Sequence, residues 1–172
     1  MDNTLSPTSK VIDLTDLELD ETSLVCRSYN DGIWYYDPIR FELIRKNQEL
    51  KTTNTSGNLA NILSINIQAN YLVEHNNKVY LNDPKNGILV FDNFGTYLKT
   101  IPIYGVSSFQ VKDQFIIYAN SNHQIEWYHF FKLAQTVYKE EHYNTVKSVR
   151  VEGSLLYIQN KKNQLIIDKI EQ

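Results

Sequence analysis

The sequence predicts an all-β protein built from short strands joined by tight turns. Three counts over its 172 residues carry this prediction: four alanines, 21 aromatic residues of which 12 are tyrosine, and 18 asparagines. Alanine is the best helix former, whereas aromatic residues favour strands. Asparagine tolerates the left-handed backbone of turns, so many tight turns are expected.

Length, charge and cysteine content limit the number of domains and the kinds of partner and metal site that are expected. A chain of this length fits one domain, residues 1–172, and its formal net charge is −3. Bases and acids nearly balance after residue 22, which argues against nucleic acid as a partner. Cys26 is the single cysteine, so neither an internal disulfide nor a thiolate metal cluster is expected.

The sequence shows neither a membrane span nor an export signal. It has no run of 18 apolar residues, and its first 20 residues carry acids where a signal peptide has a basic and then an apolar region. As written, the chain therefore reads as cytoplasmic. The acidic residues 13–21 are interpreted as a solvated connector.

The strands are clearest between residues 71 and 103. Short apolar-alternating runs at 71–74, 78–82, 88–92 and 96–103 are separated by turn residues. Pro84 presets a turn backbone angle, and Gly87 and Gly95 can adopt a positive φ. This stretch predicts a four-stranded antiparallel meander.

The same pattern recurs along the chain. Residues 32–38 and 78–84 are both aromatic-rich runs that end in Asp-Pro, and further copies lie at 114–120 and 154–160. Taking Tyr80, Tyr118 and Tyr157 as equivalent gives steps of 38 and 39 residues. Each copy is followed by a second strand, at 41–45, 88–92, 124–129 and 165–170. A polar insertion at 52–61, expected to be a loop, accounts for the longer first step.

A period of roughly 40 residues with four short strands is the signature of a β-propeller blade. The predicted fold is therefore about four blades, at residues 22–54, 62–103, 106–140 and 145–172, and a β-sandwich is the alternative. The last unit ends after its third strand, so residues 10–14 are a possible closing strand. Either a small closed ring or a partial propeller results.

Residues 32–50 and 78–103, above all the run 87–98, resemble the repeats of NHL-like and YVTN-like β-propellers. They are particularly similar to uncharacterised propeller proteins of Gram-negative bacterial envelopes. The resemblance implies six to eight blades and an export signal. It therefore implies a periplasmic or cell-envelope location if a leader was removed or lies upstream.

No catalytic motif is found. The sequence has no nucleophile elbow, phosphate-binding glycine loop or zinc-protease helix. The histidines, including His75, are read as turn and surface residues, and Asp37 and Asp83 as turn-capping residues. We therefore expect no catalytic residue, no metal site and no cofactor.

Two aromatic sets are the candidates for a binding surface, because exposed aromatic residues suit a protein partner. The candidate partner-binding residues are Trp34, Trp127, Tyr128, Phe130 and Phe131. Burial between neighbouring blades is the competing interpretation for all of them.

The predicted function is that of a non-catalytic scaffold or protein-recognition module. Its partner would be another protein or a second copy of the same chain, in a homodimer. One alternative is a glycan-binding propeller that stacks sugars on Trp34 or Trp127. Another is a hydrolase or lyase with a site at the central channel. Its polar groups would come from Asn30, Asp31, Asn76, Asn77 and Asp113.

Overall fold

The computed structural model describes residues 15, 24–29, 31–138, 143 and 145–170, which form four antiparallel sheets and one short helix. The first sheet holds β1 (Leu24–Ser28), β2 (Gly32–Asp37), β3 (Glu42–Asn47) and β4 (Thr52–Thr55). The second holds β5 (Tyr71–His75), β6 (Lys78–Asp83), β7 (Gly87–Asp92) and β8 (Tyr97–Ile101). The third holds β9 (Phe109–Val111), β10 (Phe115–Ala119), β11 (Ile125–His129) and β12 (Ala134–Tyr138). The fourth holds β13 (Val146–Glu152), β14 (Leu155–Asn160) and β15 (Leu165–Lys169).

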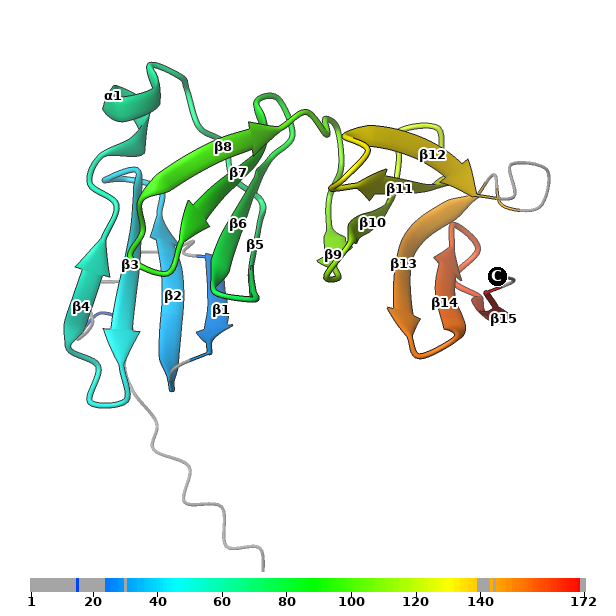
Figure 1. Ribbon diagram of the computed structural model, residues 1–172, viewed down its shortest axis with the longest axis horizontal. Helices are drawn as coiled ribbons and strands as arrows, with labels where there is room; N and C mark the ends of the chain where they lie inside the picture. The colour runs from blue at the N-terminus through cyan, green and yellow to red at the C-terminus, as the bar shows by residue number, and fades with distance from the viewer. Residues whose placement is uncertain (1–14, 16–23, 30, 139–142, 144, 171–172) are drawn as a thin grey trace, which may run out of the picture.

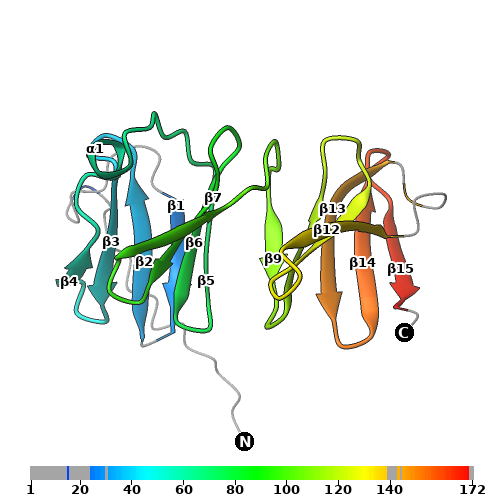
Figure 2. The same cartoon turned by 45° about the horizontal axis from the view of Figure 1, so that its top comes forward.

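The predicted all-β fold of propeller-type units is confirmed, in the form of a partial propeller. Strands follow one another in chain order within each sheet, as in a meander. Figure 1 shows the four sheets along an open arc, with the first and fourth at opposite ends, and Figure 2 shows their strands side by side. First strands of neighbouring sheets touch at both ends of the arc, β1 with β5 and β9 with β13.

The four sheets span residues 24–55, 71–101, 109–138 and 146–169, where the sequence predicted units at 22–54, 62–103, 106–140 and 145–172. The possible closing strand at 10–14 lies outside the described residues, as do all of residues 13–21 except Thr15. No helix among the described residues is long and apolar enough to cross a membrane.

One apolar cluster joins each pair of neighbouring sheets. Because side chains alternate along a strand, a middle sheet packs on both of its faces. We call the face toward the next sheet along the chain the forward face and the opposite one the back face. In the second sheet Leu81 and Leu89 point back into the cluster shared with the first sheet. Ile88 and Val90 point forward into the cluster shared with the third.

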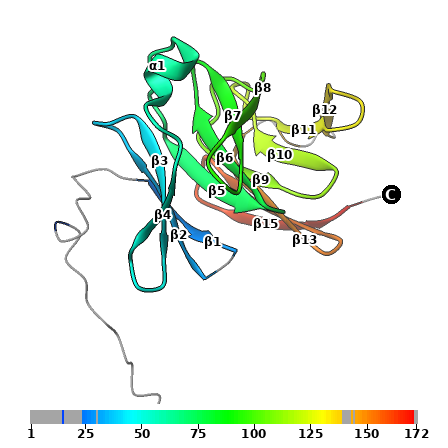
Figure 3. The ribbon, with the colours of Figure 1, turned by 60° about the vertical axis from the view of Figure 1, so that its left-hand side comes forward.

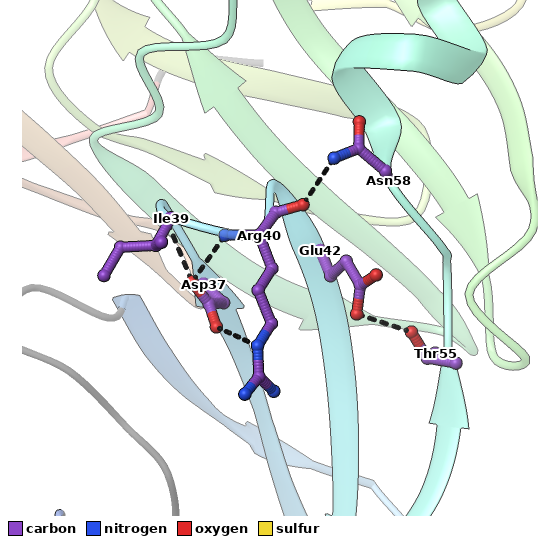
Figure 4. Close-up of polar contacts among 6 residues, drawn as sticks. All are labelled: Asp37, Ile39, Arg40, Glu42, Thr55 and Asn58. Carbon is purple, nitrogen blue, oxygen red and sulfur yellow. Dashed lines mark hydrogen bonds and ion pairs between the residues drawn. The ribbon is translucent and has the colours of Figure 1, made fainter.

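The turn after the second strand of every sheet is capped in the same way. Asp37 Oδ1 accepts the backbone N–H groups of Ile39, at 2.8 Å, and Arg40, at 2.9 Å (Figure 4). Side-chain oxygens accept two backbone N–H groups in the corresponding turns at Asp83, Asn120 and Asn160. The turn-capping role predicted for Asp37 and Asp83 is thereby confirmed. These four capping residues also fix the true register of the repeat.

That register corrects one equivalence drawn from the sequence. The residue three positions before the cap is Trp34, Tyr80, Ile117 or Tyr157, so Ile117 and not Tyr118 corresponds to Tyr80. Tyr80 points forward from the second sheet, whereas Tyr118 points back from the third, and both enter the same cluster. A slip of one residue moves a side chain to the other face of a sheet, which is why the apparent match was wrong.

The insertion predicted as a loop at 52–61 is also corrected. Thr52–Thr55 forms β4, which pairs with β3, and α1 (Leu59–Leu63) follows it at the end of the first two sheets (Figure 3). Asn58 caps the helix because its Oδ1 accepts the Asn61 N–H at 2.9 Å. Leu59 is buried in the cluster between the first two sheets. The sequence did not predict this burial because most residues around Leu59 are polar.

Candidate partner-binding cleft

The structure buries two of the five aromatic candidates. Trp34 is 0% exposed in the cluster between the first and second sheets. Tyr128 is buried in the cluster between the second and third. Trp127 points the other way, toward the fourth sheet, and its ring centroid lies 4.3 Å from that of Phe115. Trp34 and Tyr128 are too buried to stack a sugar, while Trp127 is partly buried and packs against Phe115 and Tyr138.

The other two candidates reach the surface. Phe130 is half-buried against the cluster between the second and third sheets, with its ring edge-to-face to Tyr128 at 6.2 Å. Phe131 follows β11 and is 86% exposed. Phe130 also lines a cavity between the second and third sheets.

This cavity between the second and third sheets has a volume of about 210 Å³. Apolar and aromatic side chains from both sheets line part of it: Tyr80, Val90, Ile101 and Phe130. Polar and charged residues complete the lining: His75, Asn76, Lys78, Lys99, Lys112 and Asp113. We call this site the lysine cleft.

A β-bulge brings Lys99 into the lysine cleft. Along β8 the pairing with β7 shifts, so Tyr97 lies opposite Phe91 while Lys99 lies opposite Val90, and Leu98 is the extra residue. Tyr97 consequently packs on the back face, although residues two apart in a regular strand share a face. Lys99 instead joins the forward face beside Val90 and lines the cleft.

The other two lysines come from a strand and a turn. Lys78 lies two residues before Tyr80 in β6 and therefore shares its forward face. Lys112 follows β9, and its Nζ is 3.7 Å from the exposed Glu152 Oε2. The lining carries three lysines and the carboxylate of Asp113, and Glu152 is paired with Lys112, so one positive charge remains in excess at the cleft on a chain of net charge −3.

A polar clamp ties the two hairpins at the cleft together. Asp113 Oδ1, in the β9–β10 turn, accepts the Asn76 side-chain amide at 2.6 Å and lies 3.1 Å from His75 Nε2. These hydrogen bonds, first from His75 and then from Asn76, hold the pKa of Asp113 below its usual value. Two residues of the predicted channel site, Asn76 and Asp113, are thus brought together.

The lining of the lysine cleft offers charges, hydrogen-bonding groups and an apolar floor. It includes no serine, threonine or cysteine, and burial raises the pKa of Tyr80 to about 12, which keeps its hydroxyl protonated at neutral pH. Among the described residues, no three His, Cys, Asp or Glu side chains gather to hold a metal ion.

Sequence reasoning had not singled out the lysines. Lys78 could have been found, because alternation from the aromatic Tyr80 places it on the same face. Lys99 could not have been found, because a β-bulge decides which face of the sheet its side chain joins, and this bulge has no signature in the sequence. The cleft also needs two sheets to meet, which only the three-dimensional arrangement shows.

Comparison with known proteins supports the fold alone. No family model and no curated protein matches the chain. Among solved structures, the computationally designed Ika4 protein matches with a TM-score of 0.62 and 8% identity, over 87% of this chain and 92% of that one. PorZ, a surface component of the Porphyromonas gingivalis type-IX secretion system, matches with a TM-score of 0.64 and 15% identity, over 93% and 22%.

BBS1N, solved in complex with ARL6DN, matches with a TM-score of 0.57 and 14% identity, over 87% of this chain and 50% of that one. The chain therefore spans most of Ika4 but half or less of these other two proteins. The structural neighbours are β-propeller-like proteins, and at identities of 15% or less they support the fold of this chain and not a function.

Proposed function

We propose that this protein is a non-catalytic recognition module that binds an acidic segment of a protein partner at the lysine cleft. The observation that carries the proposal is the union of three lysines with an apolar floor in one cavity. A segment with carboxylates and one apolar side chain satisfies both parts of that lining.

The geometry supports a partner of this kind in two ways. The cavity is large enough for one apolar side chain, which would contact Phe130 and Tyr80 while neighbouring carboxylates meet Lys78 and Lys99. Phe131, the residue after Phe130, adds a ring that is 86% exposed. Buried aromatic anchors usually supply most of the binding energy, and charges around them set orientation and association rate.

Two features favour binding over catalysis. His75 is held by Asp113, and no aliphatic hydroxyl or thiol lines the cleft. One structural neighbour, BBS1N, was itself solved with a protein bound, which is in keeping with an interaction module.

A fluorescent peptide tests the proposal. The probe carries the sequence of residues 13–21, Asp-Leu-Thr-Asp-Leu-Glu-Leu-Asp-Glu, which alternates acids with leucines. We expect the wild-type chain to bind it with an affinity that falls as salt rises, and Lys78→Glu with Lys99→Glu to weaken binding at least tenfold. The probe with its acids changed to Asn and Gln should bind no better than that double variant.

Lys161→Glu is the matched control, because it makes the same charge change in the β14–β15 turn, away from the lysine cleft. This variant should bind like the wild type. Failure of the wild type to bind, or an equal loss in the control, would refute the proposal. Circular dichroism of each variant separates lost binding from lost folding.

A further inference from the structure

Another cavity, of about 360 Å³, lies between the third and fourth sheets. Its lining comes from the β8–β9 connection, the capping turn after β10, the start of β13 and the turn after β14. In these antiparallel sheets the capping turns lie at the opposite end of the strands from the β5–β6 and β9–β10 hairpins, which border the lysine cleft. We call this second site the cap-end cavity.

The lining of the cap-end cavity carries positive charge without a carboxylate. It includes Lys147, which is exposed in β13, and Lys161, which is exposed in the β14–β15 turn. Within the described part of the chain neither ammonium group has an ion-pair partner, whereas Lys112 at the lysine cleft faces Glu152. Both charges are therefore available to an anion that enters the cavity.

The capping residues explain why this end of the third and fourth sheets is positive. The first two sheets are capped by carboxylates, Asp37 and Asp83, and Asp37 Oδ2 lies 3.8 Å from Arg40 Nε. The third and fourth sheets are capped by the neutral amides of Asn120 and Asn160, which accept the same kind of backbone hydrogen bonds. The repeat thus loses its acidic group where the two lysines gather.

Uncharged donors complete the lining. His123 Nδ1 lies 3.3 Å from the backbone oxygen of Val146, so a proton on Nδ1 is donated to that carbonyl and holds the half-buried ring between the two sheets. Nε2 is then left for a ligand and carries an N–H when the ring is protonated. The hydroxyls of Ser107 and Ser121 can each donate one further hydrogen bond into the cavity.

We propose that the cap-end cavity binds a phosphate group, either free or carried by a small molecule. A phosphate monoester has a charge of about −1.5 to −2 at pH 7 and three acceptor oxygens. Lys147 and Lys161 together balance that charge, whereas a single carboxylate would balance only one of them. The cavity volume lies within the range of about 300–1,000 Å³ that is usual for small-molecule sites, so part of the molecule that carries the phosphate also fits.

An NMR titration of the isotope-labelled full chain with ribose 5-phosphate tests the proposal. The amide signals of Ser121, His123 and Lys147 should shift and saturate together, and ribose without the phosphate should leave them in place. Inorganic phosphate should shift the same signals. An equal affinity for both would identify free phosphate as the ligand, and a higher affinity for the ester a phosphorylated small molecule. No saturable shift with either, or the same shift with ribose, would overturn the proposal.

A double charge reversal tests the two lysines. Lys147→Glu with Lys161→Glu should weaken binding of ribose 5-phosphate at least about tenfold, because charge-assisted contacts are lost. Lys132→Glu with Lys169→Glu is the matched control, since it makes the same charge change on exposed residues of the same two sheets, at the other end of their strands. This control should bind like the wild type. An equal loss in both double variants would mean that net charge alone decides binding, and would overturn the proposal.

A single substitution tests the imidazole while keeping the turn. His123 has a φ of 62°, and Asn163, at the same distance from the cap of the fourth sheet, has a φ of 58°. His123→Asn should therefore keep the fold, as circular dichroism can check, and weaken phosphate binding at least about threefold. An unchanged affinity would overturn the role given to His123.

The cap-end cavity and the lysine cleft can be tested separately because they lie between different pairs of sheets. Lys78→Glu with Lys99→Glu should leave the affinity for ribose 5-phosphate unchanged. If this variant lost phosphate binding as well, the phosphate would bind at the lysine cleft, and the assignment to the cap-end cavity would be wrong.

Discussion

The outer faces of the first and fourth sheets differ in how far the described part of the chain covers their apolar side chains. Both faces carry apolar side chains at positions that are buried elsewhere in the arc. Leu50 packs over Tyr35 and Ile44 in the first sheet, whereas Leu165 and Ile167 in the fourth sheet remain exposed. The comparison teaches that a position in the repeat sets whether its side chain is apolar. The segments that pack around that side chain set whether it is buried.

The largest contrast is expected from one substitution made in both end sheets. Leu43→Ala removes a fully buried side chain and should lower the free energy of unfolding by about 2–5 kcal/mol. Leu165→Ala, at the equivalent exposed position, should change it by less than about 0.5 kcal/mol. Urea denaturation at low protein concentration measures both. Equal losses would mean that the fourth sheet is covered in the free chain.

Thiol reactivity gives the second contrast. Burial, and then the charge of Glu74, raises the pKa of Cys26 in the first sheet to about 12, so little thiolate forms at pH 8. An exposed cysteine introduced by Leu165→Cys should keep a pKa of about 8.5. Alkylation at pH 8 should therefore be at least about a hundredfold faster at position 165, which mass spectrometry of digested protein can follow. Comparable rates would contradict the burial of Cys26.

The capping turns give a third, smaller contrast. Asp83 accepts hydrogen bonds from the backbone N–H groups of Gln68, Lys85 and Asn86, and its side chain is fully buried. Asp83→Ala leaves these donors without an acceptor and should cost about 2–3 kcal/mol. Asn160→Ala in the fourth sheet removes two accepted bonds and one that its neutral amide donates to Gln164, and should cost about 1 kcal/mol. Thermal unfolding of the two variants checks the order.

Acid should weaken the second-sheet turn selectively. Burial raises the pKa of Asp83, but the hydrogen bonds from Gln68, Asn86 and Lys85 outweigh it and leave the pKa lowered. A lowered pKa stabilises the fold above the unfolded value of about 3.9 and loses that contribution as pH falls further. Wild type should therefore lose stability below pH 4 more steeply than Asp83→Asn. Parallel pH profiles would contradict this role.

The smallest effect is expected at the cover of the first sheet. Lys46→Ala removes a cation over the Tyr35 ring and a hydrogen bond from Nζ to Thr52 at 3.3 Å. Both groups are near the surface, so the free energy of unfolding should fall by only about 0.5 kcal/mol. Chemical denaturation measures this free energy. A loss above about 2 kcal/mol would mean that Lys46 is the side chain that mainly covers Tyr35.

Much of the fold could be predicted from the sequence because turn chemistry is local. Asp37 and Asp83 precede proline and cap their turns through side-chain oxygens a few atoms away. Strand alternation likewise needs only neighbouring residues. Tyr118 was misassigned because three tyrosines at similar spacing looked equivalent, while the cap at Asn120 places Ile117 in that register.

The candidate site was less predictable because it depends on contacts between distant residues. Phe130 and Phe131 were proposed from their bulk, and burial then separates them from Trp34 and Tyr128. Lys99 and Asp113 meet in one cleft only because a bulge turns β8 and two sheets pack together. Neither event leaves a periodic signal in the sequence.

Hydroxyl-radical footprinting of dilute protein tests most directly whether the two end sheets differ as described. Mass spectrometry reads the labelling of Leu165, Ile167 and Tyr35. In dilute protein we expect strong labelling of Leu165 and Ile167 and almost none of Tyr35. Strong labelling of Tyr35, or weak labelling of Leu165 and Ile167, would contradict the account.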